Sequence, residues 1–164
     1  MLGGDLLVAP VFTKEGDVDY YLPEGTWTSF LDNRVVEGGK WQHEVHGFMS
    51  LPLMARENSL IPVGCNDQEV EYDYGKDLTL HLFALKDRAS ADVKDMCGND
   101  MLKACAKNEN GKVTLTFEGK AEGMKVLLRN VKGVKALNGA EAEETELGTL
   151  LHVNAGLSDV TFEM

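Results

Sequence analysis

The fold class is decided by the run Lys112-Val113-Thr114-Leu115-Thr116-Phe117, in which polar and apolar residues alternate. Successive side chains of a β-strand point to opposite faces of a sheet, so the apolar residues of this run share one face and its threonines the other. We therefore expect a strand that is buried on one face only. Similar short runs rich in Leu, Val, Thr and Phe occupy 78–83, 125–129, 149–153 and 160–162.

The first half of the chain has the same character. Strand-like runs at 19–22, 26–30, 40–45 and 59–63 are separated by the turn formers Pro23-Glu24-Gly25, Asp32-Asn33 and Gly38-Gly39. No helical period of apolar residues competes over a comparable length, and the Ala- and Glu-rich segment 139–147 is interpreted as a loop. Short strands at this spacing are typical of sandwiches. The sequence therefore predicts an all-β fold of two consecutive antiparallel β-sandwich domains.

A polar and acidic segment separates the two sets of strands. Residues 64–76 contain the run Asn66-Asp67-Gln68-Glu69-Val70-Glu71 and are interpreted as a linker. This interpretation predicts a proximal sandwich over 11–76 and a distal sandwich over 77–164.

The run Leu6-Leu7-Val8-Ala9, which ends at Pro10, is apolar throughout. A continuous apolar run suits a strand that is buried on both faces, as in a parallel sheet or a barrel. Residues 1–10 are therefore interpreted as a strand whose neighbours are absent from this chain. Because unpaired strand edges and apolar faces recruit other chains, self-association through residues 1–12 is expected.

Charge and cysteine content limit the partners and the compartment. The net charge of −11 and a pI near 4.7 disfavour nucleic acid and anionic membranes as partners, whereas a neutral sugar is compatible. No segment approaches the roughly 20 apolar residues that cross a bilayer, and the start of the chain lacks the basic and apolar parts of a secretion signal. Cys65, Cys97 and Cys105 form an odd set without CxxC spacing, so we expect free thiols and a cytoplasmic location.

Motifs for catalysis, cofactor binding and metal binding are missing from the sequence. It contains no GxSxG, HExxH or glycine-rich phosphate loop. His43 and His46 are three apart in a strand pattern, where they face opposite sides, which disfavours a metal site. The following acidic residues are interpreted as turn, strand-end or surface residues: Asp5, Asp17, Asp19, Asp73 and Asp77. We therefore assign no catalytic, cofactor-binding or metal-binding residue and expect no cofactor.

Trp27 and Trp41 are the side chains best suited to stack on a sugar ring, since an aromatic face can contact the C–H side of a pyranose. Each lies in a short strand run with turns close by, where aromatic residues usually cover the sheet. We expect both in the core, with sugar contact as the alternative. His46 and Arg56 are also interpreted as structural, the histidine pinning a loop and the arginine acting as an ion-pair or backbone donor.

Two motifs lie in register near the start of the chain, Leu6-Leu7-Val8-Ala9-Pro10-Val11 and Tyr21-Leu22-Pro23-Glu24-Gly25-Thr26-Trp27. They are followed by Gly39 with Trp41, His46–Leu53, Arg56, Asn58 and Ile61–Gly64. Together these segments resemble the end of the catalytic barrel and the proximal C-terminal domain of family 31 glycoside hydrolases, and are most similar to the bacterial α-xylosidase branch. The resemblance covers residues 1 to about 85, and the remainder is similar to the family's distal sandwich in length, position and strand character.

The resemblance implies a retaining mechanism whose aspartate nucleophile and aspartate acid/base both lie upstream of this segment. Residues 1–10 would be a remnant of the last catalytic-barrel strand. The expected function is a non-catalytic C-terminal accessory region of a retaining α-glycosidase, of α-xylosidase or α-glucosidase type, which caps and stabilises the absent barrel, its expected partner. The alternative is a carbohydrate-binding module that holds polysaccharide near the active site. The chain alone is expected to be inactive.

Overall fold

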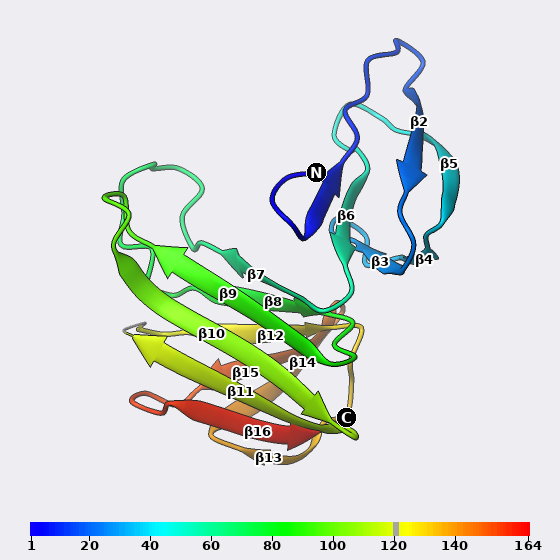
Figure 1. Ribbon diagram of the computed structural model, residues 1–164. Coiled ribbons are helices and arrows are strands. Elements are labelled where there is room, and N and C mark those ends of the chain that lie inside the picture. Colours follow the sequence, from blue (N-terminus) through cyan, green and yellow to red (C-terminus); the bar gives the residue numbers. More distant parts are fainter. Residues whose placement is uncertain (120–121) are drawn as a thin grey trace. The chain divides into compact units, whose positions relative to one another are not determined.

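A computed structural model describes residues 1–119 and 122–164 of the chain (Figure 1). The described residues form sixteen β-strands and no α-helix, which confirms the all-β prediction. They divide into two compact units, Met1–Glu57 and Asn58–Met164. None of the described segments is a helix long and apolar enough to cross a membrane.

The first unit contains two antiparallel sheets. Its four-stranded sheet has the order β1 (Leu6–Val8), β6 (Leu53–Arg56), β3 (Thr26–Ser29) and β4 (Val35–Glu37). Its two-stranded sheet pairs β2 (Asp17–Leu22) with β5 (Lys40–Val45). The inward side chains of the two sheets form one core, made of Leu7, Ala9, Val18, Tyr20, Leu22, Trp27 and Met54.

Trp27 lies at the centre of this core and has no exposed surface, as the sequence predicts. Its indole Nε1–H donates to the backbone oxygen of Pro23 at 2.9 Å, so the polar atom of the buried ring is satisfied. Gly38 packs beside it, and a Cβ atom there would lie only 1.7 Å from the same Pro23 oxygen. The turn before β5 therefore requires glycine at this position.

Strand β1 lies at the edge of the four-stranded sheet of the first unit. It pairs antiparallel with β6, and Leu7 and Ala9 are buried in the core of the first unit. Leu6 and Val8, on the alternate positions, are only half-buried. The continuous apolar run thus belongs to an edge strand of this unit and is not buried on both faces.

The second unit is a sandwich of two five-stranded sheets. One sheet has the order β13 (Lys135–Asn138), β16 (Asp159–Glu163), β11 (Lys112–Gly119), β10 (Asp100–Glu109) and β9 (Arg88–Lys94). The other has the order β14 (Ala140–Thr145), β15 (Gly148–Val153), β12 (Lys125–Arg129), β8 (Thr79–Phe83) and β7 (Ser59–Val63). Strand β12 runs parallel to β8, whereas the other neighbours are antiparallel.

Strand β11 bears out the alternation on which the fold class was predicted. Val113, Leu115 and Phe117 are buried in the core of the second unit. The turn that joins β11 to β10 is Asn110-Gly111, with φ of 56° and 90°. Both residues therefore adopt the left-handed region that a two-residue hairpin turn requires.

The boundary between the two units lies between Glu57 and Asn58, earlier in the sequence than residues 64–76. Strand β7 pairs with β8 from Ser59↔Phe83 to Val63↔Thr79, which places it in the second unit. Asn58 makes the turn before β7 with a φ of 58°, and its side-chain oxygen accepts hydrogen bonds from the backbone N–H groups of Lys86 and Asp87 at 2.7 and 3.0 Å. Residues 64–76 follow β7, and β7 belongs to the second unit. The polar segment is therefore a loop inside the second unit and not a linker between the two units.

Candidate functional site

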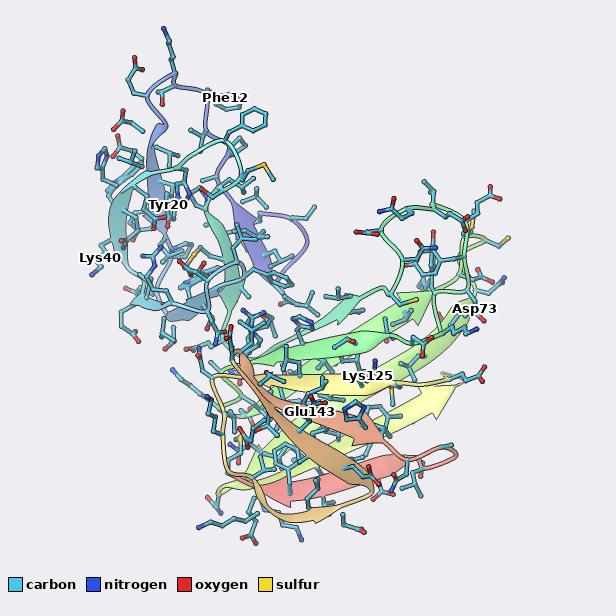
Figure 2. The ribbon with its side chains drawn as sticks, turned by 180° about the vertical axis from the view of Figure 1, so that it is seen from behind. Phe12, Tyr20, Lys40, Asp73, Lys125 and Glu143 are labelled. Atoms are coloured by element: carbon cyan, nitrogen blue, oxygen red, sulfur yellow. The ribbon has the colours of Figure 1, made fainter. Side chains whose placement is uncertain are left out.

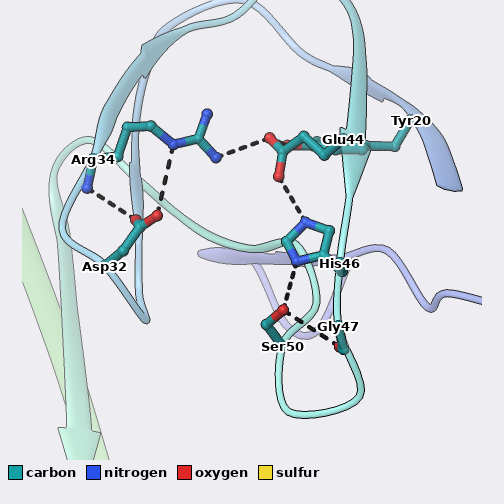
Figure 3. Close-up of polar contacts among 7 residues, drawn as sticks. All are labelled: Tyr20, Asp32, Arg34, Glu44, His46, Gly47 and Ser50. Atoms are coloured by element: carbon teal, nitrogen blue, oxygen red, sulfur yellow. Dashed lines mark hydrogen bonds and ion pairs between the residues drawn. The ribbon is translucent and has the colours of Figure 1, made fainter. Parts of the chain in front are cut away.

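A polar cluster centred on Glu44 lies in the first unit (Figure 3). Oε1 of Glu44 accepts a hydrogen bond from the Tyr20 hydroxyl at 2.7 Å and one from Nη2 of Arg34 at 2.9 Å. Its Oε2 lies 2.8 Å from Nε2 of His46, and Nδ1 of that ring lies 3.0 Å from Oγ of Ser50. Three segments of the first unit are thereby tied to one carboxylate.

The inward positions of β2 and β5 bring these groups together. Tyr20 is buried on β2, and Glu44 occupies a half-buried position on β5 beside it. Burial, together with the hydrogen bond to Glu44, raises the pKa of the Tyr20 phenol. Burial alone would raise the pKa of Glu44, but the hydrogen bonds from Tyr20, Arg34 and His46 outweigh it and hold that pKa below its usual value. The carboxylate is therefore the charged centre of the cluster.

Four residues of the cluster, Arg34, Glu44, His46 and Ser50, line a pocket of about 210 Å³. A serine, an imidazole and a carboxylate in series occur in nucleophilic hydrolases. Here the carboxylate is already held by Arg34 and Tyr20, and the Ser50 hydroxyl lies 3.4 Å from the Gly47 oxygen of its own turn. We interpret the series as the support of the loop 46–52, in agreement with the structural role expected of His46.

Two adjoining loops present large apolar side chains to solvent. The loop after β5 carries Phe48 and Met49, and the loop after β1 carries Phe12, whose ring extends from the chain in Figure 2. Each of these three side chains is 89% exposed or more. We call these three residues the apolar tip.

Backbone contacts join the two loops of the apolar tip. The N–H of His46 donates to the oxygen of Gly16 at 3.0 Å, and the N–H of Ala9 donates to the oxygen of Pro52 at the same distance. Gly16 has a φ of +88°, and a Cβ atom there would lie 2.2 Å from the His46 oxygen. The close approach of the loops therefore depends on glycine at this position.

Trp41 is not in the core, and the prediction for this residue is wrong. Its side chain is 70% exposed on the outward face of β5. It contacts Tyr21 on β2, with ring centroids 5.8 Å apart and ring planes at 68°. The inward positions of β5 are taken by Gln42 and Glu44, so the strand turns its aromatic residue to solvent and its polar residues toward the unit.

The remaining residues singled out in the sequence lie apart from the Glu44 cluster. His43 is on the outward face of β5, and its Nδ1 lies 3.0 Å from Oδ1 of Asp19. The N–H of Arg56 donates to the backbone oxygen of Asp5 at 2.9 Å, and its guanidinium carbon lies 5.7 Å from the centroid of the Trp27 ring. Sequence reasoning did not identify Tyr20, Arg34 and Glu44 as a cluster, because a single inward-facing carboxylate leaves no periodic signal of its own.

Each half of the chain matches the model of a known protein domain. Residues 1–61 match the C-terminal domain of glycosyl hydrolase family 31, and residues 73–164 match the C-terminal domain of the alpha-xylosidase YicI. The chain belongs to the C-terminal region of glycoside hydrolase family 31. Membership of family 31 confirms the resemblance seen in the two motifs near the start of the chain.

Curated relatives within family 31 are much longer than this chain. The alpha-xylosidase XylQ of Lactiplantibacillus pentosus is 36% identical over 123 residues, which cover 73% of this chain and 16% of that protein. An alpha-xylosidase of Emericella nidulans is 45% identical over 71 residues, which cover 38% of this chain and 9% of that protein. The chain thus spans a small fraction of the length of its relatives.

Solved structures show the same fold. A cycloalternan-forming enzyme from Listeria monocytogenes superposes with a TM-score of 0.79 at 19% identity, over 99% of this chain and 18% of that one. A family 31 dextranase from Flavobacterium johnsoniae superposes with a TM-score of 0.76 at 16% identity, over 99% of this chain and 26% of that one. In both, the matched region is part of a larger enzyme.

Proposed function

We propose that this chain is the non-catalytic accessory region of a family 31 α-glycosidase, of α-xylosidase or α-glucosidase type, which caps and stabilises the catalytic barrel. The observation that carries the proposal is the apolar tip. Monomeric proteins seldom expose such side chains together, and burying one Phe or Met is worth about 1.5–3 kcal/mol. In family 31 enzymes the catalytic barrel is the expected binding partner of this surface.

The Glu44 cluster supports this role because it orders the loop that carries Phe48 and Met49. A docking surface on a rigid loop loses less conformational entropy on binding than a mobile one. His46 and Ser50 fix the two ends of the turn between them, and Gly16 holds the neighbouring loop beside it. The apolar tip is therefore pre-formed before any partner arrives.

The experiment compares the isolated chain with a chimera of the L. pentosus alpha-xylosidase in which this chain replaces the matched region. Phe12→Ser, Phe48→Ser and Met49→Ser, combined, should leave the melting temperature of the isolated chain unchanged because these side chains are already exposed. The same substitutions should lower the melting temperature of the chimera by several degrees, since a loss of about 1 kcal/mol shifts the midpoint of a large domain by about 2–4 °C. Val70→Ser, at an exposed residue of the second unit, is the matched control.

An equal effect in both proteins, or none in the chimera, would refute the capping proposal. The isolated chain should also leave aryl α-xyloside and aryl α-glucoside uncleaved, because in this family both catalytic aspartates are expected upstream. Turnover that survives repurification would refute the non-catalytic assignment.

Self-association through residues 1–12 is a further proposal. It is supported by the position of β1 at the edge of its sheet and by the exposed ring of Phe12. Light scattering of the isolated chain and of Phe12→Ser tests it, and an unchanged molar mass would contradict it. A cytoplasmic location is likewise proposed, supported by three free cysteines, of which Cys65 and Cys97 are exposed.

Carbohydrate binding is the second candidate function. It is favoured by a specific observation, the exposed contact of Tyr21 with Trp41, which the capping proposal does not use. Aromatic faces bind the apolar side of sugar rings. Titration of the chain with neutral oligosaccharides tests this candidate.

A further inference from the structure

The outward face of the β2–β5 sheet has an ordered composition. Its side chains alternate with those that enter the core of the first unit, and strand pairing arranges them as three cross-strand pairs. These pairs, which we call the outer β2–β5 face, are Tyr21 with Trp41, Asp19 with His43, and Asp17 with Val45. An aromatic pair, a polar pair and a mixed pair thus follow one another along the sheet.

The aromatic pair is built differently from the aromatic residues of the core. Tyr20 and Trp27 are buried, and each uses its polar atom in a hydrogen bond within the unit. Tyr21 and Trp41 are exposed and meet edge to face at 68°, and within the described residues neither hydroxyl nor indole N–H has a partner. The pair therefore offers both an open ring face and two unused hydrogen-bond donors.

The neighbouring polar pair supplies acceptors. Nδ1 of His43 lies 3.0 Å from Oδ1 of Asp19, and its Nε2 lies 3.7 Å from Oδ1 of Asp17. The imidazole therefore lies between the two carboxylates on the surface. Residues two apart on a strand, such as Asp19 and Tyr21, are separated by about 7 Å. The Asp19 carboxylate is therefore within reach of a hydroxyl group on a sugar ring that stacks against Trp41.

We propose that the outer β2–β5 face is a binding site for a neutral pyranoside with equatorial hydroxyl groups, of the gluco or xylo configuration. The ring stacks on Trp41 with Tyr21 at its side, and a hydroxyl donates to Asp19. This inference names the site and ligand class of the second proposed function, carbohydrate binding, and rests on it.

The chemistry of the face selects this ligand class. Equatorial hydroxyls leave C–H groups on both faces of the ring, so either face is available for the indole, whereas an axial hydroxyl blocks one of the two faces. Asp17 and Asp19, on a chain with a net charge of −11, repel the carboxylate of a uronic acid. A neutral oligosaccharide satisfies both conditions.

The experiment follows the two indole N–H signals of the ¹⁵N-labelled chain in NMR spectra during titration with xyloglucan-derived oligosaccharide or maltotriose. The Trp41 signal should shift with saturation, and the signal of the buried Trp27 should stay in place as an internal control. Isothermal titration of Trp41→Ala should show binding at least about tenfold weaker, and Asp19→Asn should weaken it less. Phe12→Ala removes an exposed aromatic elsewhere in the same unit and should leave the affinity unchanged.

The outcomes separate the site from the function. Binding that Trp41→Ala and Tyr21→Ala do not change would overturn the site but leave carbohydrate binding standing. No binding of either sugar would overturn both. Equal affinity for trigalacturonate would overturn the ligand class, because that sugar is anionic and carries axial hydroxyls.

Other occupants of the face give distinct results. A Trp41 signal that moves with protein concentration in the absence of sugar would indicate a second copy of the chain and overturn the proposal. Acrylamide quenching of Trp41 in the L. pentosus chimera tests coverage by the rest of an enzyme. Protection of Trp41 there, without added sugar, would also overturn it.

Discussion

Glu44→Gln is expected to destabilise the first unit by about 2 kcal/mol. A hydrogen bond to a charged group is worth about 1.5–3 kcal/mol, and Glu44 accepts from Tyr20 and Arg34 and faces His46. The side-chain oxygen of glutamine can still accept a hydrogen bond in place of one carboxylate oxygen. The NH₂ group takes the place of the other oxygen, which was an acceptor, and the negative charge is lost. Tyr20 is buried, so its hydroxyl has little access to water in compensation.

Tryptophan fluorescence is the appropriate measurement, because both tryptophans of the chain, Trp27 and Trp41, belong to the first unit. Denaturant unfolding followed by this signal therefore reports the unit that contains Glu44. Glu15→Gln, at an exposed position of the same unit, has the same change of charge and should cost less than about 0.5 kcal/mol. Equal losses for the two variants would refute a special role for Glu44.

The dependence on pH provides an independent check on the same reasoning. The pKa of Glu44 is lower in the folded chain than its ordinary value of 4.5, so its charge stabilises the fold above that value. This contribution is lost as the pH falls through the lower, folded pKa. The difference in unfolding free energy between the parent chain and Glu44→Gln should therefore shrink in acid. A difference that stays constant down to the acid limit of folding would contradict the assignment of a charged carboxylate.

Four other substitutions give direct tests. Trp27→Ala should cost about 3–5 kcal/mol, and Trp41→Ala less than about 1 kcal/mol, in denaturant unfolding followed by circular dichroism; similar costs would contradict their opposite burial. Leu7→Lys should destabilise the first unit by about 2–4 kcal/mol, measured by tryptophan fluorescence, because it places a charge in the core; a variant as stable as the parent would contradict the position of β1. Burial, and then the charge of Arg129, lower the pKa of His81 from 6.5 to about 4, so the unfolded chain binds a proton in this range that the folded chain does not. Stability of the second unit, measured by urea unfolding, should therefore fall by about 1–2 kcal/mol from pH 7 to pH 5. This value is smaller than the full pKa shift implies, because solvent partly screens the interaction. The fall should be smaller for His81→Gln, and equal falls in the two proteins would contradict this assignment.

Alternation in the sequence was sufficient to predict the fold class and much of the second unit. The run around Leu115 has one apolar face, and its apolar residues are buried as expected. Trp27 is also placed correctly, because it lies in a short strand run with turn formers close by, where aromatic residues usually cover the sheet.

The error at Trp41 has a physical cause. Alternation on β5 separates Trp41, His43 and Val45 from Gln42 and Glu44, but it does not say which set faces inward. The apolar set would be the natural choice for the core. Glu44 faces inward instead because Tyr20, Arg34 and His46 supply hydrogen bonds to it. Tyr20 lies on another strand, 24 residues away in the sequence, so the pattern of β5 does not reveal this contact.

Pairing partners were also beyond the reach of local patterns. The apolar run at β1 indicates burial, but the sequence does not reveal that β6 pairs with it. The Glu-rich segment 139–147 was expected to be a loop, whereas β14 pairs along its length with β15 and leaves its glutamates exposed. An edge strand with one solvated face needs little apolar content, so composition alone does not identify it.

The parallel pairing of β8 with β12 has a consequence for the order of events in folding. Thr79 pairs with Lys125, so this contact closes about 46 residues of chain, at a cost in conformational entropy that a hairpin avoids. The meander β9, β10 and β11 lies between the two strands, and its Asn110-Gly111 turn joins residues that are neighbours along the chain. The β10–β11 hairpin should therefore form early, on a timescale of microseconds, and present a template on which the distant strands collect. Closure of β8 against β12 would then limit the rate, so substitutions in this pair should slow refolding more than substitutions at the free edge of β14.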